Sequence, residues 1–149
     1  MASTSFAFKQ FTIEQDQCAM KVTTDACLFG AWVCHEMAPH KNEPLQILDI
    51  GAGTGLLSLM LAQQFNHSTF TGVELDIKAA EQAQVNCAQS PWSNCINIVE
   101  GDILTFAFPS AYDLIISNPP FYENDLKATS LKKNLAFHDN GIKLGQLLI

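Results

Sequence analysis

The fold of this chain is decided by residues 45–55, which read LQILDIGAGTG. The first six residues form an apolar strand, and glycines follow at alternate positions, Gly51, Gly53 and Gly55. A helical pattern of apolar residues then runs to about residue 65. Glycine tolerates positive φ and lets the backbone approach a ligand, while the first turn of a helix offers free N–H donors. This junction predicts a ligand-binding turn in an α/β domain.

The spacing of the glycines indicates which kind of ligand the turn binds. A dinucleotide fingerprint reads GxGxxG, whereas Leu56 stands here at the position of the third glycine. That difference favours a nucleoside-containing ligand over a pyrophosphate. A dehydrogenase and a glycine turn without a ligand are the alternatives.

Strands and helices alternate around this junction. Uniformly apolar strands that alternate with helices are typical of a parallel sheet covered on both faces. We therefore expect a Rossmann-like α/β fold with a mostly parallel sheet and helices on both of its faces. An N-terminal arm and helix would span residues 1–44, and the core would span residues 45–149. The further expected elements are a hairpin or arm at 6–13, a helix from Thr24 or Asp25 to before Pro39, a strand at 69–75, a helix from Asp76 to about Gln89, and strands at 96–99 and 112–117.

Composition favours a globular protein with reduced cysteines. The 149 residues, 48% hydrophobic and 15% charged, suit one domain with a core of its own. The five cysteines include no CxxC pair, and the four histidines show no ligand spacing with them. We therefore expect free thiols and no metal.

Charge and hydropathy limit the surfaces that the chain contacts. The net charge of −7 argues against a broad phosphate-binding face, although Lys127, Lys132 and Lys133 form one local basic cluster. No apolar run reaches the roughly 18 residues of a membrane span, and the first residues lack the pattern of a secretory signal. We expect a cytoplasmic protein without membrane contact.

Acidic residues follow the second and third core strands. Glu74 comes 19 residues after Gly55, near the offset at which a carboxylate meets ribose hydroxyls. Asp102 follows Gly101 after the next strand, where an acceptor can take the amino group of an adenine. A surface residue at a strand end and a common Gly-Asp turn are the plainer alternatives.

Residues 118–121 read NPPF and follow the last apolar strand. Pro119 keeps Asn118 out of helical backbone geometry, and Pro120 does the same to Pro119. Two acceptors, the Asn118 side-chain oxygen and the Pro119 carbonyl, can take the hydrogens of an aromatic amine while Phe121 stacks on its ring. A sulfonium methyl donor needs no strong base before attack, so orientation and electrostatics suffice. The turn predicts methyl transfer to an amine, with a plain Pro-Pro turn as the alternative.

These stretches resemble the class I S-adenosylmethionine-dependent methyltransferases that act on amino groups. The resemblance narrows to the bacterial tRNA1(Val) adenine-N6 methyltransferase family. It covers nearly the whole chain, and its N-terminal block is more specific than the shared methyltransferase motifs. The matching stretches are FKQF at 8–11, CAMKV at 18–22, Thr24-Asp25, GAW at 30–32, LDIGAG at 48–53, SPW at 90–92 and LIISNPP at 114–120.

The resemblance implies S-adenosylmethionine as cofactor and a valine tRNA as partner, methylated on N6 of adenine 37, just 3′ of the anticodon. Phe121 stands where many relatives have Tyr, which keeps the stacking face. The implied cofactor-binding residues are Asp49, Gly51, Gly53 and Gly55 at its methionine side, Glu74 at its ribose and Asp102 at its adenine, with Lys21, Thr24 and Asp25 closing over it. The implied residues at the target base are Asn118, Pro119, Pro120 and Phe121. Asn118 is implied to contact the cofactor as well as the base.

One departure from the family concerns the sheet. The family's sheet has more strands than the four predicted here, and an amphipathic helix that begins near Lys143 is cut short. We therefore expect a chain truncated after the fourth strand, whose apolar edge invites self-association. Methylation of another amine, such as an rRNA or DNA base or a protein glutamine, and a cofactor-binding fragment without turnover are the alternatives.

Overall fold

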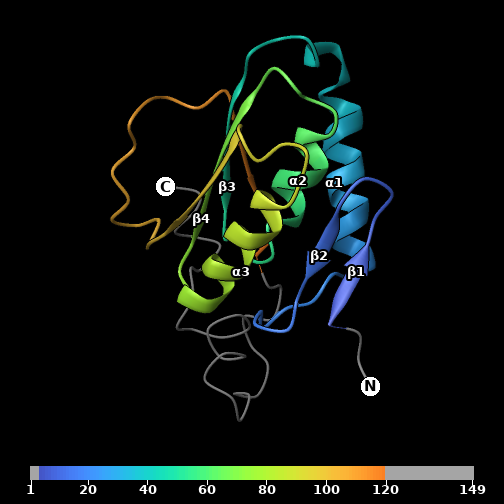
Figure 1. Cartoon of the computed structure of the whole chain (residues 1–149). Helices are drawn as coiled ribbons and strands as arrows, with labels where there is room; N and C mark the ends of the chain where they lie inside the picture. The colour runs from blue at the N-terminus through green and yellow to red at the C-terminus, as the bar shows by residue number, and fades with distance from the viewer. Residues whose placement is uncertain (1–3, 120–149) are drawn as a thin grey trace. The chain divides into compact units, whose positions relative to one another are not determined.

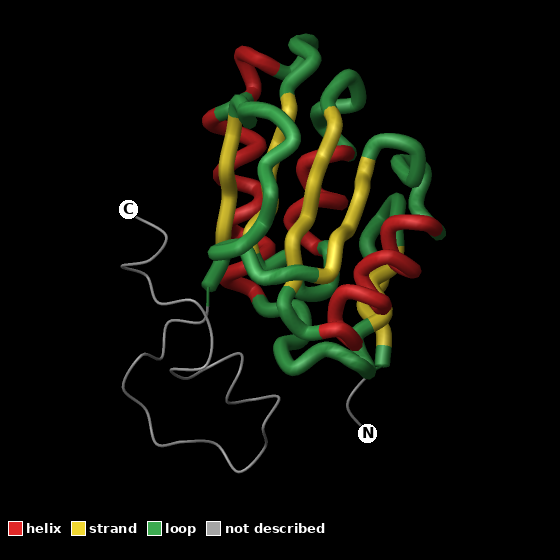
Figure 2. The backbone as a smooth tube through the Cα atoms, turned by 90° about the vertical axis from the view of Figure 1, so that its left-hand side faces the viewer, coloured by secondary structure: helices red, strands yellow, loops and turns green. Residues whose placement is uncertain are grey.

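Four parallel strands form the main sheet in the computed structural model, which describes residues 4–119 (Figures 1 and 2). Their order across the sheet is β5-β4-β3-β6. Each predicted strand is found within two residues of its expected bounds, so the parallel sheet is confirmed. The strands are β3 (Gln46–Ile50), β4 (Thr69–Glu74), β5 (Ile96–Glu100) and β6 (Leu114–Ser117).

The chain divides into two compact units, one ending at Ser117 and the other beginning at Asn118. All helices and strands named in this section belong to the first unit. The predictions for Pro120, Phe121 and the residues that follow them lie outside the described residues.

The helices of the described residues lie on one side of the sheet, and segment 101–113, orange in Figure 1, lies on the other. The chain steps in one direction from β3 to β4 to β5, so right-handed crossovers put both connecting helices on the same face. The connection from β5 to β6 runs back across the sheet and therefore passes over the opposite face. The helices are α1 (Thr24–Glu36), the short 3₁₀ helix Ala38–His40, α2 (Leu56–Ala62) and α3 (Ile77–Ala88).

Side-chain caps fix where two of the helices begin. Asp76 accepts a hydrogen bond from the Ala79 amide at 3.0 Å, which confirms it as the cap of α3. The cap of α1 is Thr23, whose hydroxyl accepts from the Ala26 amide at 3.4 Å. The prediction of Thr24 or Asp25 as this cap is wrong, because both residues are already helical.

The main core lies between the sheet and the helices. On the opposite face Leu48 and Val73 are also buried, and segment 101–113 contributes the buried Ile103. The helix-side core includes Ile47, Phe70, Ile98 and Ile116 from the strands with Leu59, Leu61 and Ala83 from the helices.

The apolar side chains of α1 are only partly buried. Val33 is buried, but Leu28 is 65% and Trp32 58% exposed. The helix contacts α2 and approaches it closely at Gly30, where a Cβ would stand 2.7 Å from the Met60 sulfur. Close approach at a small residue turns the larger side chains of the same helix outward.

An antiparallel hairpin, β1 (Ser5–Ala7) and β2 (Thr12–Glu14), confirms the predicted N-terminal hairpin. Its Phe11 and Ile13 side chains are buried in the main core. Phe11 also meets Trp92 edge to face, with ring centroids 5.9 Å apart. The arm is therefore part of the same packed unit as the sheet.

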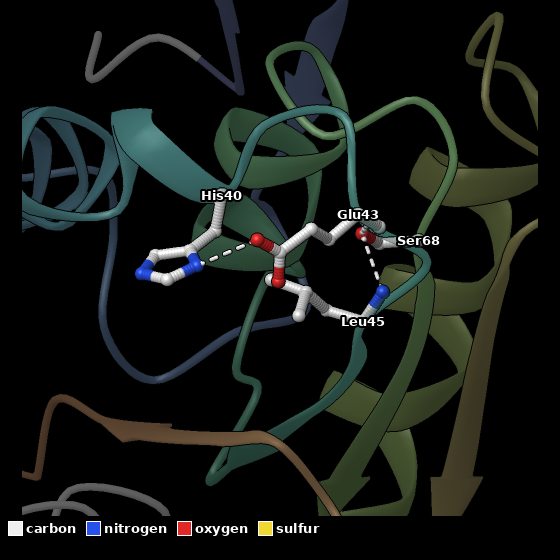
Figure 3. Close-up of polar contacts among 4 residues, drawn as sticks. All are labelled: His40, Glu43, Leu45 and Ser68. Carbon is white, nitrogen blue, oxygen red and sulfur yellow. Dashed lines mark hydrogen bonds and ion pairs between the residues drawn. The ribbon is translucent and has the colours of Figure 1, made fainter.

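Hydrogen bonds hold the turn that leads into β3 in place at the amino end of the sheet (Figure 3). The buried Ser68 hydroxyl accepts from the Leu45 amide and donates to the Glu43 carbonyl, each at 3.2 Å. His40 and Glu43 form an exposed ion pair at 3.0 Å. These contacts lie at the end of the strands opposite the glycine turn.

Candidate functional site

Parallel strands bring the predicted site residues to one edge of the sheet. The glycine turn 51–55 follows β3, Glu74 ends β4 and Asp102 comes two residues after β5. All three stretches lie at the carboxyl ends of their strands, which is where open α/β sheets bind ligands. The Ser117 hydroxyl donates to the Ile50 carbonyl at 2.9 Å and ties the end of β6 to the same edge.

The glycine turn needs glycine for its backbone conformation. The φ angles of Gly51, Gly53 and Gly55 are +71°, +56° and +80°, which strain any residue with a Cβ. A Cβ on Gly51 would meet nothing within 4 Å, so space beside this backbone is open. A Cβ on Gly55 would stand 3.2 Å from the Cys87 sulfur. One end of the turn is therefore open and the other is packed on α3.

Gly72 explains how closely the turn approaches the sheet. A Cβ on this β4 residue would stand 2.5 Å from Ile98 Cδ1 and 3.0 Å from Ala52 Cβ. The absence of a side chain at Gly72 lets the turn pack against the strand.

Glu74 links the turn to the neighbouring strand. Its Oε2 accepts from the Gly53 amide at 2.8 Å, and its Oε1 accepts from the Asp76 amide at 2.9 Å. A carboxylate oxygen can accept more than one hydrogen bond, so a held carboxylate keeps acceptor capacity for ligand hydroxyls. The side chain is half-buried and fixed in orientation.

Asp49 lies behind the turn rather than on its open side. Its side chain is 1% exposed, and Oδ2 accepts from the Ser58 hydroxyl of α2 at 2.8 Å. Burial, with a smaller contribution from the charge of Glu74, raises the pKa of Asp49 to about 6, although the hydrogen bonds from Ser58 lower it. The geometry therefore ties β3 to α2. Its predicted contact with the cofactor's methionine side stays a prediction.

Asp102 organises its own turn. Its Oδ1 accepts from the Leu104 amide at 2.9 Å, and its carbonyl accepts from the Thr105 amide at 3.0 Å. The residue is half-buried at the same edge as Glu74. The adenine contact stays a prediction.

The residues predicted to close over the cofactor lie around the start of α1. Thr24 and Asp25 form its first helical residues, and Lys21 precedes its cap; all three are exposed. Asn118 and Pro119 follow β6 directly in the chain and belong to the second unit. Their roles, like those of Pro120 and Phe121, stay predictions.

Asn86 is a site residue that the sequence did not indicate. It is 1% exposed on α3, donates to the carbonyls of Thr54 and Glu14 at 2.9 Å each, and accepts from the Glu14 amide at 2.9 Å. Its one local signal is a polar side chain on the buried face of an alanine-rich helix. That signal does not name its partners, which lie 32 and 72 residues away in the chain.

Three further predictions concern the cysteines, metal binding and membrane-spanning helices. None of the five cysteines, all of which lie within the described residues, forms a disulfide. Residues 4–119 contain no group of three or more His, Cys, Asp or Glu side chains that could hold a metal ion. No helix within these same residues is both long and apolar enough to cross a membrane.

Two solved structures have a similar fold, and one of them is a putative methyltransferase. The hMettl16 catalytic domain, in complex with MAT2A 3′UTR hairpin 6, is similar over 76% of this chain and 40% of that chain, with a TM-score of 0.60 and 24% identity. A putative S-adenosyl-L-methionine-dependent methyltransferase from Methanococcus maripaludis is similar over 62% of this chain and 42% of that chain, with a TM-score of 0.54 and 27% identity. The parallel sheet and glycine turn therefore define a class I methyltransferase fold.

The chain belongs to the methyltransferase small domain family, whose sequence model matches residues 33–140. Curated relatives named tRNA1(Val) (adenine(37)-N6)-methyltransferase include one from Dyadobacter fermentans, 48% identical over 96% of this chain and 57% of the relative. Another, from Porphyromonas gingivalis, is 43% identical over 99% of this chain and 59% of the relative. The chain thus spans somewhat more than half the length of these relatives.

Proposed function

We propose that this chain binds S-adenosylmethionine and catalyses N6-methylation of adenine 37 in tRNA1(Val). Relatives at 42–48% identity carry that name and match nearly all of this chain. The observation that supports the cofactor site most is the hydrogen bond from the Gly53 amide to Glu74, because it joins two predicted contacts at one edge. A tRNA substrate agrees with the expected cytoplasmic location.

The exposed groups at this edge suit an adenosine-containing cofactor. Open space beside Gly51 leaves room for a ligand against the backbone, and the fixed Glu74 carboxylate can accept ribose hydroxyls. Leu75 and Ile77, one and three residues after Glu74 in the chain, are 41% and 54% exposed and offer apolar surface for a planar base. The remaining acceptor capacity of Asp102 suits an adenine amino group.

A bound S-adenosylmethionine would supply an electrophilic methyl group on a cationic sulfur to the amine nitrogen, leaving a neutral thioether, and the displaced amine proton would pass to water. The side-chain oxygen of Asn118 and the carbonyl of Pro119 hold the amine hydrogens. This contact draws the nitrogen lone pair out of the ring and directs it, which is a contribution of orientation and electrostatics.

Transfer of a labelled methyl group to tRNA tests the proposed activity. We expect label in a tRNA1(Val) transcript and none in the matched transcript that carries guanine at position 37. Equal labelling of both transcripts would point to another base. Label in protein but not in tRNA would overturn the RNA substrate in favour of a protein amine.

Cofactor binding without turnover is the second candidate. It is favoured by the location of residues 51–55, Glu74 and Asp102 in the unit that ends at Ser117, whereas the proposed base-holding turn begins at Asn118. Calorimetry with S-adenosylhomocysteine separates the two. Binding without methyl transfer to tRNA would support this candidate, and no binding would contradict both.

We also infer self-association along β6. This strand forms one end of the described sheet, and its Ile115 side chain is 58% exposed. Sedimentation at rising protein concentration tests the inference, and an unchanged monomer would contradict it.

A further inference from the structure

Hydrogen bonds hold the N-terminal arm against α3 at two positions. Glu14 exchanges two hydrogen bonds with the Asn86 side chain, each at 2.9 Å. One helical turn earlier, Gln82 accepts from the Gln17 amide at 3.0 Å and donates to the Asp16 carboxylate. Asn86 and Gln82 are both buried, whereas Asp16 and Gln17 are exposed, so the contacts of Asn86 with half-buried Glu14 are the better shielded from water.

Asn86 differs from Gln82 in a second contact. Its amide nitrogen also donates to the carbonyl of Thr54, inside the glycine turn, at 2.9 Å. Three hydrogen bonds therefore use both polar atoms of one buried side chain. Asn86 is the link through which the position of the arm and the conformation of the turn depend on one another.

We propose that Asn86 is a positioning residue that couples docking of the N-terminal arm to ligand binding at the glycine turn. A side chain that holds both segments stabilises them together, so whatever orders the turn also orders the arm. Coupling of this kind is reciprocal: ligand binding tightens the arm by the same factor by which arm docking tightens the ligand. The inference rests on the proposed cofactor site.

The test uses Asn86→Asp, which keeps the shape of the side chain and its acceptor for the Glu14 amide. The change removes both donated hydrogen bonds and sets an acceptor against the carbonyls of Thr54 and Glu14. We expect S-adenosylhomocysteine affinity to fall by roughly 5- to 150-fold. Gln84→Ala is the matched control, because exposed Gln84 lies on the same helix and donates instead to the Ile98 carbonyl.

Gln82→Leu separates the arm from the turn. It removes the second fastening of the arm without touching Thr54. If coupling runs through arm docking, this variant weakens S-adenosylhomocysteine binding to a smaller extent than Asn86→Asp. Wild-type affinity in both variants, with both folded, would overturn the proposal.

Hydrogen exchange of the unmodified chain keeps the proposal testable if Asn86→Asp does not fold. The Glu14 amide, which donates to Asn86, should exchange more slowly when S-adenosylhomocysteine is bound, whereas the Leu45 amide at the far end of the sheet should not change. A purely structural Asn86 would give no ligand-dependent protection at Glu14. Binding without this protection would overturn the coupling alone, and no binding would overturn the cofactor site and the coupling together.

Discussion

The Gly53 amide donates to Glu74 Oε2 across 2.8 Å, and this contact joins the turn after β3 to the end of β4. Two residues that are 21 positions apart in the chain thereby form one rigid corner. Because the other carboxylate oxygen is held by the Asp76 amide, the corner also includes the start of α3.

Glu74→Gln should weaken the binding of S-adenosylhomocysteine. The glutamine side chain keeps one oxygen acceptor, and its NH₂ group replaces the other carboxylate oxygen. This NH₂ group would face the backbone N–H of either Gly53 or Asp76, so that two donors would oppose each other. Loss of charge-assisted hydrogen bonds worth about 1.5–3 kcal/mol predicts a decrease of about 10- to 150-fold in affinity by calorimetry. Glu100→Gln, at the exposed opposite position on β5, is the control and should bind normally. Equal affinity for both variants would argue against a ribose contact at Glu74.

Asn118→Ala should separate transfer from binding. If the amide oxygen holds the target amine, the variant loses about 100-fold or more of the methyl-transfer rate, because an oriented hydrogen bond to the reacting group is gone. S-adenosylhomocysteine affinity should change little. A loss of affinity as large as the loss of rate would place Asn118 at the cofactor instead.

Gly72→Ala should destabilise the domain, and a second change should restore part of the loss. The new methyl group overlaps Ile98 Cδ1, which cannot move freely in the core. We expect a loss of about 1–3 kcal/mol in the free energy of unfolding, measured with urea. Ile98→Val deletes the overlapping carbon, so the double variant should lose less than the sum of the two single changes. Additive losses would show that Ile98 is not the obstacle.

The stability of the domain should decrease as the pH rises through the titration of Asp49. The folded pKa of about 6 lies above the reference value of 3.8, so the folded state binds the proton more tightly. The contribution of Asp49 is then fully present below about pH 4 and lost above about pH 6, a difference of about 3 kcal/mol at 1.36 kcal/mol per pKa unit. Urea unfolding at pH 4.5 and pH 7 measures it. Asp49→Asn should lose this part of the pH dependence, and an unchanged profile would contradict the assignment.

Cys87 should resist alkylation in the folded chain. Burial, together with the smaller effect of the charge of Asp49, raises the pKa of its thiol to about 12. The thiolate that reacts with iodoacetamide is therefore scarce at pH 8. Mass spectrometry should find Cys87 unmodified until urea unfolds the domain, with half-exposed Cys18 as the reference thiol. Equal labelling rates for the two thiols in the native chain would refute the prediction.

Local sequence patterns predicted much of the fold and only part of the site. The apolar strand at 45–50 and the alternate glycines that follow act through backbone sterics and burial, which are local, so their arrangement was predictable. The outward position of Trp32 depends on how Gly30 meets Met60 on another helix. The Asn86 contacts join segments that no periodic pattern connects.

Because the arm is hydrogen-bonded to α3, these contacts of the arm form only after α3 has been synthesised. Glu14 leaves the ribosome 72 residues before Asn86. At about 5–20 residues per second, roughly 4–14 seconds of synthesis separate the two partners. During that interval Phe11 and Ile13 exist without the core that later buries them. A segment that is synthesised before the sheet thus reaches its native contacts only after α3 has been made.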